Sequence, residues 1–269
     1  MAFTDEQIER YSRHIILKGF GTKGQKRLSA GSVLIVGAGG LGSPAALYLA
    51  AAGVGRIGIV DSDVVELSNL QRQIAHATSD IGAPKANSAA ASMRAINPDI
   101  EVVTHRLFLD ASNIADIFES YDFIIDGTDN FPTKFLVNDA CVLLGKPFSH
   151  GGILRFSGQL MTYVPGEGPC YRCAFKEQPA PGAAPSCAQA GVIGAVAGVV
   201  GSLQAMEAIK YLAGIGELLT GKLLMYDALF GDFTELELPG REPKCAVCGD
   251  NPTITELKPE NYDPVLCHI

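Results

Sequence analysis

Short apolar segments recur along the first half of the chain and predict strands that alternate with helices. The expected strands lie at residues 33–36, 57–60, 101–105 and 123–126. Apolar residues at helical spacing predict intervening helices that end near residue 52 and that span 84–96 and 112–119. Strands and helices that alternate at this spacing imply a parallel sheet with right-handed crossovers.

The pattern changes after Pro147. Segments 158–164 and 222–227 read as antiparallel strands, and between them lie a Pro/Gly-rich loop at 176–186 and a long helix at about 190–213. We therefore expect an α/β fold in which a Rossmann-like parallel sheet continues into an antiparallel C-terminal part.

Composition excludes several classes of protein. The 269 residues include 21 Lys and Arg against 29 Asp and Glu, a formal charge of −8, which disfavours binding to nucleic acid or an anionic membrane. The longest weakly polar run, 190–203, is shorter than the ~20 residues of a membrane-spanning helix. The N-terminus has no secretory signal pattern. We expect a cytoplasmic protein.

A glycine-rich turn follows the first predicted strand and opens the next helix. Its glycines are Gly37, Gly39, Gly40 and Gly42, and Asp61 closes the following strand. Backbone N–H groups and the helix N-terminus can hold phosphates there, while a carboxylate at this distance suits a ribose. We therefore expect a nucleotide site. The alternative is a turn needed only for close packing, and the motif alone does not separate a nicotinamide cofactor from ATP.

Polar residues gather after the next strands. Arg72 and Lys85 follow the second strand, and the motif Asp126–Asn130 follows the fourth. Cations neutralise phosphates, and a carboxylate can hold Mg(II). Each residue alone also reads as a solvated charge or a turn cap. Because all lie at carboxyl ends of predicted parallel strands, where open α/β sheets bind ligands, we favour phosphate chemistry.

Four of the seven cysteines form two CxxC pairs, Cys170 with Cys173 and Cys245 with Cys248. Two such pairs can supply four thiolates to a closed tetrahedral zinc site, in which no position is open for catalysis. We therefore expect structural Zn(II) that staples the C-terminal part of the fold. Redox-active thiols are the alternative.

Cys187 stands apart from these pairs, just before the predicted long helix. A helix N-terminus can lower the pKa of a thiol, so Cys187 is a candidate for sulfur transfer. A partly buried, inert thiol is an equal alternative.

Over nearly its whole length the chain resembles the MoeB/ThiF/HesA family of adenylating enzymes, bacterial relatives of the ubiquitin-activating enzymes. The matching segments are R-Y-S-R-H-I-I-L at 10–17, G-A-G-G-L-G-S-P at 37–44, S-N-L-Q-R-Q at 68–73, D-G-T-D-N-F at 126–131, C-Y-R-C at 170–173, G-S-L-Q-A-M-E-A-I-K at 201–210 and C-A-V-C-G at 245–249. The resemblance implies ATP-dependent adenylation of the C-terminal Gly-Gly carboxylate of a ubiquitin-like sulfur-carrier protein, as in molybdopterin or thiamine biosynthesis.

The resemblance also implies roles for individual residues. It assigns Gly40, Asn69, Arg72 and Lys85 to the ATP phosphates, Asp61 to the ribose and Asp129 to Mg(II), with Gly37, Gly39, Gly42 and Asn130 in the same site. Arg13 would reach the nucleotide from the other subunit of a homodimer. Residues 1–31 then form a helical segment, 32–249 the adenylating domain with its zinc site, and 250–269 a short tail.

Relatives that donate sulfur themselves carry a further C-terminal domain, whereas only 20 residues follow Gly249 here. We therefore expect a separate sulfur donor. An NAD-dependent oxidoreductase that uses the same glycine turn is the alternative enzyme, and a zinc-stapled scaffold that merely binds nucleotide is the non-enzymatic one.

Overall fold

The computed structural model describes residues 3–179 and 190–262. Its strands are β1 (Ser32–Val36), β2 (Arg56–Val60), β3 (Glu101–His105), β4 (Phe123–Asp126), β5 (Phe148–Leu154), β6 (Ser157–Tyr163), β7 (Lys222–Asp227) and β8 (Asp232–Glu237). Its helices are α1 (Asp5–Arg10), α2 (Ser12–Ile15), α3 (Gly21–Ala30), α4 (Gly42–Ala52), α5 (Lys85–Ile96), α6 (Ile114–Phe118), α7 (Phe131–Leu144), α8 (Tyr171–Ala174) and α10 (Gly194–Ala213).

Within the described residues, eight strands form one continuous sheet in the order β3-β2-β1-β4-β5-β6-β7-β8. Strands β1 to β5 pair in parallel, and β5 to β8 pair antiparallel. The predicted change from parallel to antiparallel pairing is therefore confirmed, and β5 is the strand at which it occurs.

Helices cover both faces of the sheet. One apolar core joins β1 and β2 to α4, α5 and α10, through side chains such as Leu49, Met93 and Ala208. A second core lies on the opposite face between the sheet and α6 and α7, where Phe118 and Phe135 are fully buried. The sheet thus forms the middle layer, as in other parallel α/β folds.

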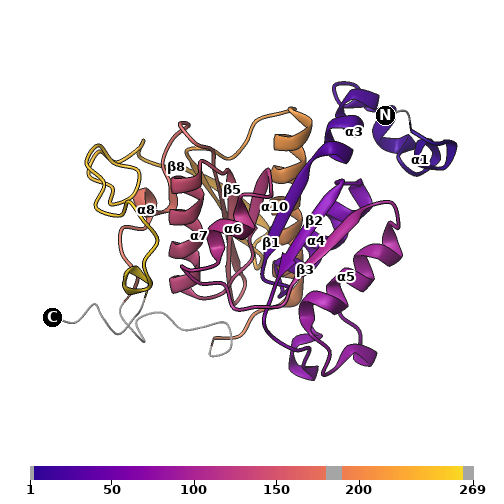
Figure 1. Ribbon diagram of the computed structural model, residues 1–269, viewed down its shortest axis with the longest axis horizontal. Helices are drawn as coiled ribbons and strands as arrows, with labels where there is room; N and C mark the ends of the chain where they lie inside the picture. The colour runs from indigo at the N-terminus through magenta and orange to yellow at the C-terminus, as the bar shows by residue number, and fades with distance from the viewer. Residues whose placement is uncertain (1–2, 180–189, 263–269) are drawn as a thin grey trace.

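The N-terminal helices lie at the end of the sheet where strands β1 and β2 begin. The carbonyl of Leu28 in α3 accepts a hydrogen bond from Gly55, and that of Gly31 accepts one from Arg56. Figure 1 shows α1 and α3 at one end of the molecule and α8 with the final loops at the other.

Strands β5 and β8 were not predicted. The β5 sequence FSHGGIL contains no continuous apolar run, and it becomes a strand because it pairs with β4 on one side and β6 on the other. All six residues of β8 are exposed, and their pairing with β7 defines this edge strand. Helix α7 begins at Phe131, where the Asn130 side chain caps it.

The described part of the tail packs against the body of the protein. Ile254, Leu257 and Tyr262 join the second core, and the Tyr262 hydroxyl donates a hydrogen bond to Asp139 of α7 at 3.0 Å. Residues 250–262 therefore contribute to the fold. Among the described residues, no helix has the length and apolar character that crossing a membrane requires.

Candidate active site

A cavity of about 680 Å³ opens at the carboxyl ends of β1, β2 and β4. Eight of the residues predicted for the nucleotide site line it, namely Gly37, Gly39, Gly40, Asp61, Arg72, Lys85, Asp129 and Asn130. The structure thus brings together residues that the sequence distributes over more than 90 positions, at the edge where open α/β sheets bind ligands.

The glycine turn has steric reasons for its composition. Gly37 has φ +95°, and a Cβ there would lie 3.1 Å from the carbonyl oxygen of Gly127. A Cβ on Gly42 would lie 1.8 Å from the carbonyl oxygen of Gly37. Gly42 is buried beneath the turn and does not line the cavity, so its role is close packing, whereas Gly39 and Gly40 face the cavity.

Asp61 holds the turn from the end of β2. Its Oδ2 accepts a hydrogen bond from the Ala38 N–H at 2.8 Å, and its Oδ1 accepts one from Asp63 at 2.8 Å. Burial raises the pKa of this carboxyl above its ordinary value, although the two backbone bonds oppose the shift. Because carboxylate oxygens accept more than one bond each, Asp61 retains capacity for ribose hydroxyls.

Two cations line the cavity. The Lys85 ammonium at the start of α5 lies 2.9 Å from the Asp63 carboxylate, and Arg72 donates to the Ser68 carbonyl at 3.1 Å. Arg72 forms no ion pair with any of the described residues. One guanidinium is thus available for an anionic ligand, and the ion pair of Lys85 is exposed on its Asp63 side.

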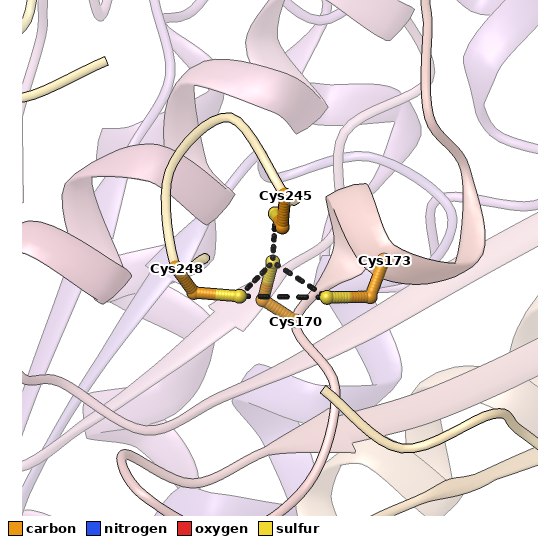
Figure 2. A group of neighbouring side chains, drawn as sticks. All are labelled: Cys170, Cys173, Cys245 and Cys248. Carbon is orange, nitrogen blue, oxygen red and sulfur yellow. Dashed lines mark hydrogen bonds between the residues drawn. The ribbon is translucent and has the colours of Figure 1, made fainter. Parts of the chain in front are cut away.

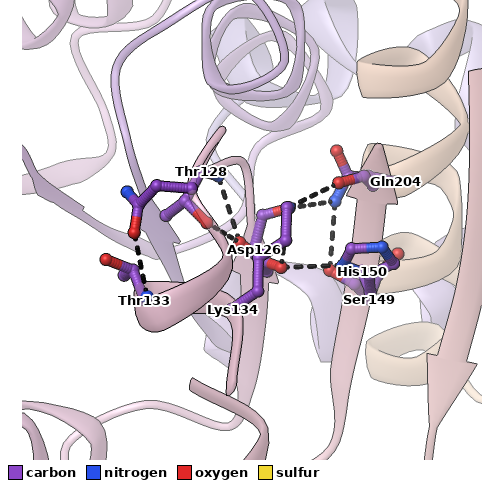
Figure 3. A network of polar contacts seen from close by, with 9 residues as sticks. Asp126, Thr128, Thr133, Lys134, Ser149, His150 and Gln204 are labelled. Atoms are coloured by element: carbon purple, nitrogen blue, oxygen red, sulfur yellow. Dashed lines mark hydrogen bonds and ion pairs between the residues drawn. The ribbon is translucent and has the colours of Figure 1, made fainter. Parts of the chain in front are cut away.

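The loop after β4 contains a buried polar network (Figure 3). Asp126 is 0% exposed; its Oδ2 lies 3.2 Å from the Lys134 ammonium and 2.8 Å from His150 Nδ1, and its Oδ1 accepts a bond from the Thr128 hydroxyl at 2.6 Å. Burial opposes ionisation, but Lys134 and His150 together hold the pKa of Asp126 below its ordinary value. Asp126 therefore organises the loop, and its partners leave it poorly placed to bind a metal.

Asp129 has the opposite environment. Its side chain is exposed, lines the cavity, and forms no hydrogen bond or ion pair with residues 3–179 or 190–262. A free carboxylate beside a phosphate site is the kind of oxygen ligand that Mg(II) prefers. The neighbouring Asn130 uses its side-chain oxygen to cap α7 at the Thr133 N–H, 2.9 Å away. Of the two, Asp129 is thus the better metal ligand.

Besides Gly42, two residues that the resemblance assigned to the nucleotide lie outside the cavity lining. Asn69 is buried in a short turn, where its side-chain oxygen accepts a hydrogen bond from Glu66. Arg13 is exposed on α2, at the edge of the sheet where β1 and β2 begin, whereas the cavity lies where they end. Arg13 therefore does not reach the cavity of its own chain.

The cavity includes residues that the sequence did not single out. Lys134, His150, Gln73 and the exposed Phe108 all line it. Lys134 lies four residues after Asn130, and a lysine in the first turn of a helix that follows a strand could have suggested a contact with the strand end. Phe108 carries no comparable indication, because a single aromatic residue in a loop is common.

The four CxxC cysteines meet beside α8, as predicted (Figure 2). Their sulfurs lie within 4.8 Å of one another, with separations of 3.8 Å for Cys170 and Cys173 and 3.4 Å for Cys173 and Cys248. Four sulfurs that bind one zinc at about 2.3 Å lie about 3.8 Å apart. The geometry fits a structural zinc ion, and the Glu242 N–H also approaches the Cys173 sulfur at 3.4 Å.

The cysteine cluster is anchored to the body of the protein. Arg172, between two of the ligands, donates two hydrogen bonds to Asp139 of α7 at 2.7 and 2.8 Å. Tyr171 packs against His150, with ring centroids 4.5 Å apart, and lines the cavity. The cluster thus contacts the same network that supports the loop carrying Asp129. Cys187, the candidate for sulfur transfer, lies outside the described residues.

Comparison with known proteins gives a consistent assignment. The ThiF family model matches residues 11–247. A sulfur carrier protein adenylyltransferase of Thermus thermophilus is 51% identical over 262 residues, which cover 96% of each chain. The adenylyltransferase and sulfurtransferase MOCS3 of Bos taurus is 50% identical over 257 residues, 96% of this chain but 56% of that protein, so the chain spans about half its length.

A solved structure supports the assignment. The crystal structure of E. coli MccB with ATP matches the fold with a TM-score of 0.75 at 26% identity, covering 89% of this chain and 74% of that one. Together with the glycine turn, the cavity and the cysteine cluster, these matches show that the chain belongs to the ThiF family.

Proposed function

We propose that the protein adenylates the C-terminal carboxylate of a small ubiquitin-like sulfur-carrier protein, using ATP and releasing pyrophosphate. The observation that supports this most is the placement of Arg72, Lys85 and Asp129, which has no partner among the described residues, around one cavity at the glycine turn. Two cations and a free carboxylate suit a triphosphate with its metal better than they suit hydride transfer. The relative from Thermus thermophilus bears the corresponding name.

The shape of the cavity accommodates a second substrate. From the glycine turn it continues along Gly152–Leu154 of β5 and Ser157–Gln159 of β6 to Met225 of β7. A cavity that follows neighbouring strands suits an extended peptide, and Gly152 adds no side-chain bulk to its wall. This is where we place the carrier's flexible C-terminal segment, which we propose ends in Gly-Gly.

The chemical step needs positioned charges more than a proton acceptor. A C-terminal carboxylate is ionised at neutral pH and can attack the α-phosphorus directly. The Arg72 guanidinium and the Lys85 ammonium then stabilise the negative charge that develops on the phosphates. The Gly39 and Gly40 backbone holds the nucleotide, and the Asp61 carboxylate binds its ribose.

Asp129 is the residue we assign to Mg(II). The metal ion, when bound, neutralises phosphate charge in such reactions. The Asp126 network fixes the backbone of the loop, so that Asp129 stays at the cavity wall although its carboxylate has no partner among the described residues. The separate sulfur donor and the contribution of Arg13 from a second copy remain predictions of the sequence.

ATP–pyrophosphate exchange tests the proposal. We expect exchange only when a carrier with a free C-terminal carboxylate is added, because that carboxylate is the attacking group. Replacing Arg72 by Ala should lower the rate by about 10²-fold or more, as loss of one charged contact to a transition state does. Exchange that needs no carrier, or exchange supported by a carrier whose C-terminal carboxylate is blocked as an amide, contradicts the proposal.

A further inference from the structure

The backbone of Ala38, in the centre of the glycine turn, is held from two sides. Its N–H donates to Asp61 Oδ2 at 2.8 Å, and its carbonyl oxygen lies 3.0 Å from His76 Nε2. Ala38 is fully buried and His76 is 8% exposed. Because a carbonyl oxygen can only accept, the proton of this second bond belongs to His76 Nε2.

The bond from His76 sets the direction of a neighbouring group. The Ala38 carbonyl and the Gly39 N–H belong to one planar trans peptide, so they point in opposite directions. Gly39 lines the cavity, and its N–H donates to none of the described residues. By holding the carbonyl away from the cavity, His76 leaves the Gly39 N–H free to bind an anion there.

A second set of bonds fixes the His76 ring. Its Nδ1 lies 2.8 Å from the Ser88 hydroxyl of α5, and that hydroxyl donates to Asp80 Oδ2 at 2.8 Å. Burial lowers the pKa of His76, with Lys85 also lowering it, whereas the bond to Ala38 raises it. The Ala38 bond needs the Nε2 proton. The neutral Nε2–H tautomer supplies it when the Ser88 hydroxyl turns to donate to Nδ1, and the imidazolium supplies it while that hydroxyl donates to Asp80, so the Ala38 bond forms in both charge states.

We propose that His76 is a positioning residue for the phosphates of the nucleotide, acting through the Ala38–Gly39 peptide. The proposal rests on the proposed nucleotide site. It predicts that loss of the His76 Nε2–H lets this peptide rotate and weakens phosphate binding, while the part of the site that holds the nucleoside is unaffected. His76 itself touches no substrate.

The test compares ATP with adenosine, which lacks the phosphates. For His76→Phe, which removes both ring nitrogens, we expect the Kd of ATP to rise about tenfold and that of adenosine to change by less than about twofold, since one hydrogen bond to a charged group is at stake. For His76→Gln, whose amide nitrogen can replace Nε2–H, we expect the Kd of ATP within about threefold of the native protein. Titration calorimetry measures all these values.

Two serines of α5 provide a matched pair. Ser88→Ala removes the partner of the His76 ring, and we expect it to weaken ATP binding about threefold. Ser92→Ala, one turn later, removes a hydrogen bond of 2.6 Å to the Ala75 carbonyl. We expect Ser92→Ala to lower the free energy of unfolding about as much as Ser88→Ala does and to leave ATP binding unchanged. If His76→Phe fails to fold, this pair of variants still tests whether His76 positions the peptide for phosphate binding.

The outcomes separate the two proposals. Equal loss of ATP and adenosine affinity in His76→Phe, unchanged ATP affinity in that folded variant, or equal effects of the two serine variants overturns the positioning role. Arg72→Ala tests the nucleotide site itself. If Arg72→Ala binds ATP as the native protein does, the nucleotide site is misplaced and the role of His76 falls with it. A loss in Arg72→Ala together with unchanged binding in His76→Phe refutes the role of His76 alone.

Discussion

Asp126 and Asp129 lie on one loop, three residues apart, and have opposite environments. Asp126 is fully buried and bonded to Lys134, His150 and Thr128, whereas Asp129 is exposed at the cavity wall and bonded to none of the described residues. The first carboxylate therefore has a structural role. The second is free for a ligand, which is why we assign it to Mg(II).

Replacing Asp129 by Ala is expected to reduce carrier-dependent ATP–pyrophosphate exchange by several orders of magnitude and to leave the melting temperature within about 2 °C. An exposed side chain without partners contributes little to stability, while the proposed metal ligand is essential. Asp116→Ala is the control, since Asp116 is also exposed, on α6, and lies outside the cavity. Full exchange activity in Asp129→Ala contradicts the assignment.

Removal of one ligand from the cysteine cluster is expected to lower both metal content and stability. For Cys248→Ser we predict less than half of the native zinc content and a melting temperature lower by more than 5 °C, because a closed thiolate site contributes folding free energy directly. Cys141→Ala removes a buried cysteine that is not in the cluster and should leave zinc content unchanged. Native protein with well under half an equivalent of zinc refutes the zinc site.

Much of the fold could be predicted because local pattern and long-range packing agree there. The strands at Val33–Val36 and Ile57–Val60 are apolar on both faces, as buried parallel strands are, and the turn after the first of them has glycine at positions where a Cβ would clash. The two CxxC pairs likewise predicted that their four cysteines come together at one site. The sequence left ATP and a nicotinamide as alternatives, and membership of the ThiF family favours ATP.

The remaining features depend on contacts that no local pattern reports. Strand β5 contains Ser149, His150 and two glycines. These residues fit a buried strand only because of contacts with residues that are distant in the sequence. Gln204 of α10, for example, donates to the Ser149 and Asp126 carbonyls at 3.0 and 2.8 Å. The partnership of Asp126 with His150, 24 residues later, is of the same kind. Sequence reasoning identified the loop at 126–130 but could not tell which of its two carboxylates is buried.

A mixing experiment tests whether Arg13 acts in a neighbouring subunit. We expect Arg13→Ala and Asp129→Ala to be inactive alone and to regain up to about a quarter of native exchange activity after subunit exchange, because one site of a mixed dimer then has both native residues. The position of Arg13, at the edge of the sheet away from its own cavity, motivates this prediction. Absence of recovery in a verified mixed dimer excludes the arrangement.

Cys187→Ser is expected to leave exchange within about a factor of two of the native rate. Adenylation proceeds by attack of a carboxylate on ATP and uses no thiol, whereas loss of a catalytic nucleophile costs several orders of magnitude. Mass spectrometry of the carrier shows whether the same variant still supports replacement of oxygen by sulfur at the carboxyl terminus. A folded Cys187→Ser protein that has lost exchange itself contradicts the separation of adenylation from sulfur transfer.

The buried His150 predicts how stability depends on pH. Burial, together with the nearby Lys134 charge, lowers the pKa of His150 to about 4, against an ordinary value of 6.5. Between pH 6.5 and about 4 the unfolded chain therefore binds a proton at this residue that the folded protein does not. The free energy of unfolding then falls as the pH falls, by roughly 3 kcal/mol in total over this window from His150 alone.

The variant His150→Asn isolates this contribution. The asparagine amide can replace Nδ1–H as a donor to Asp126 but does not titrate, so the variant should be less stable at pH 7, where the ring contact with Tyr171 is lost. Its stability should also decline less steeply between pH 6.5 and 4. His76 and His105, whose pKa values burial also lowers, contribute to the slope in both proteins and cancel in the difference. Urea titrations at half-unit pH intervals measure the two slopes, and equal slopes would show that His150 takes up its proton as readily in the folded protein as in the unfolded chain.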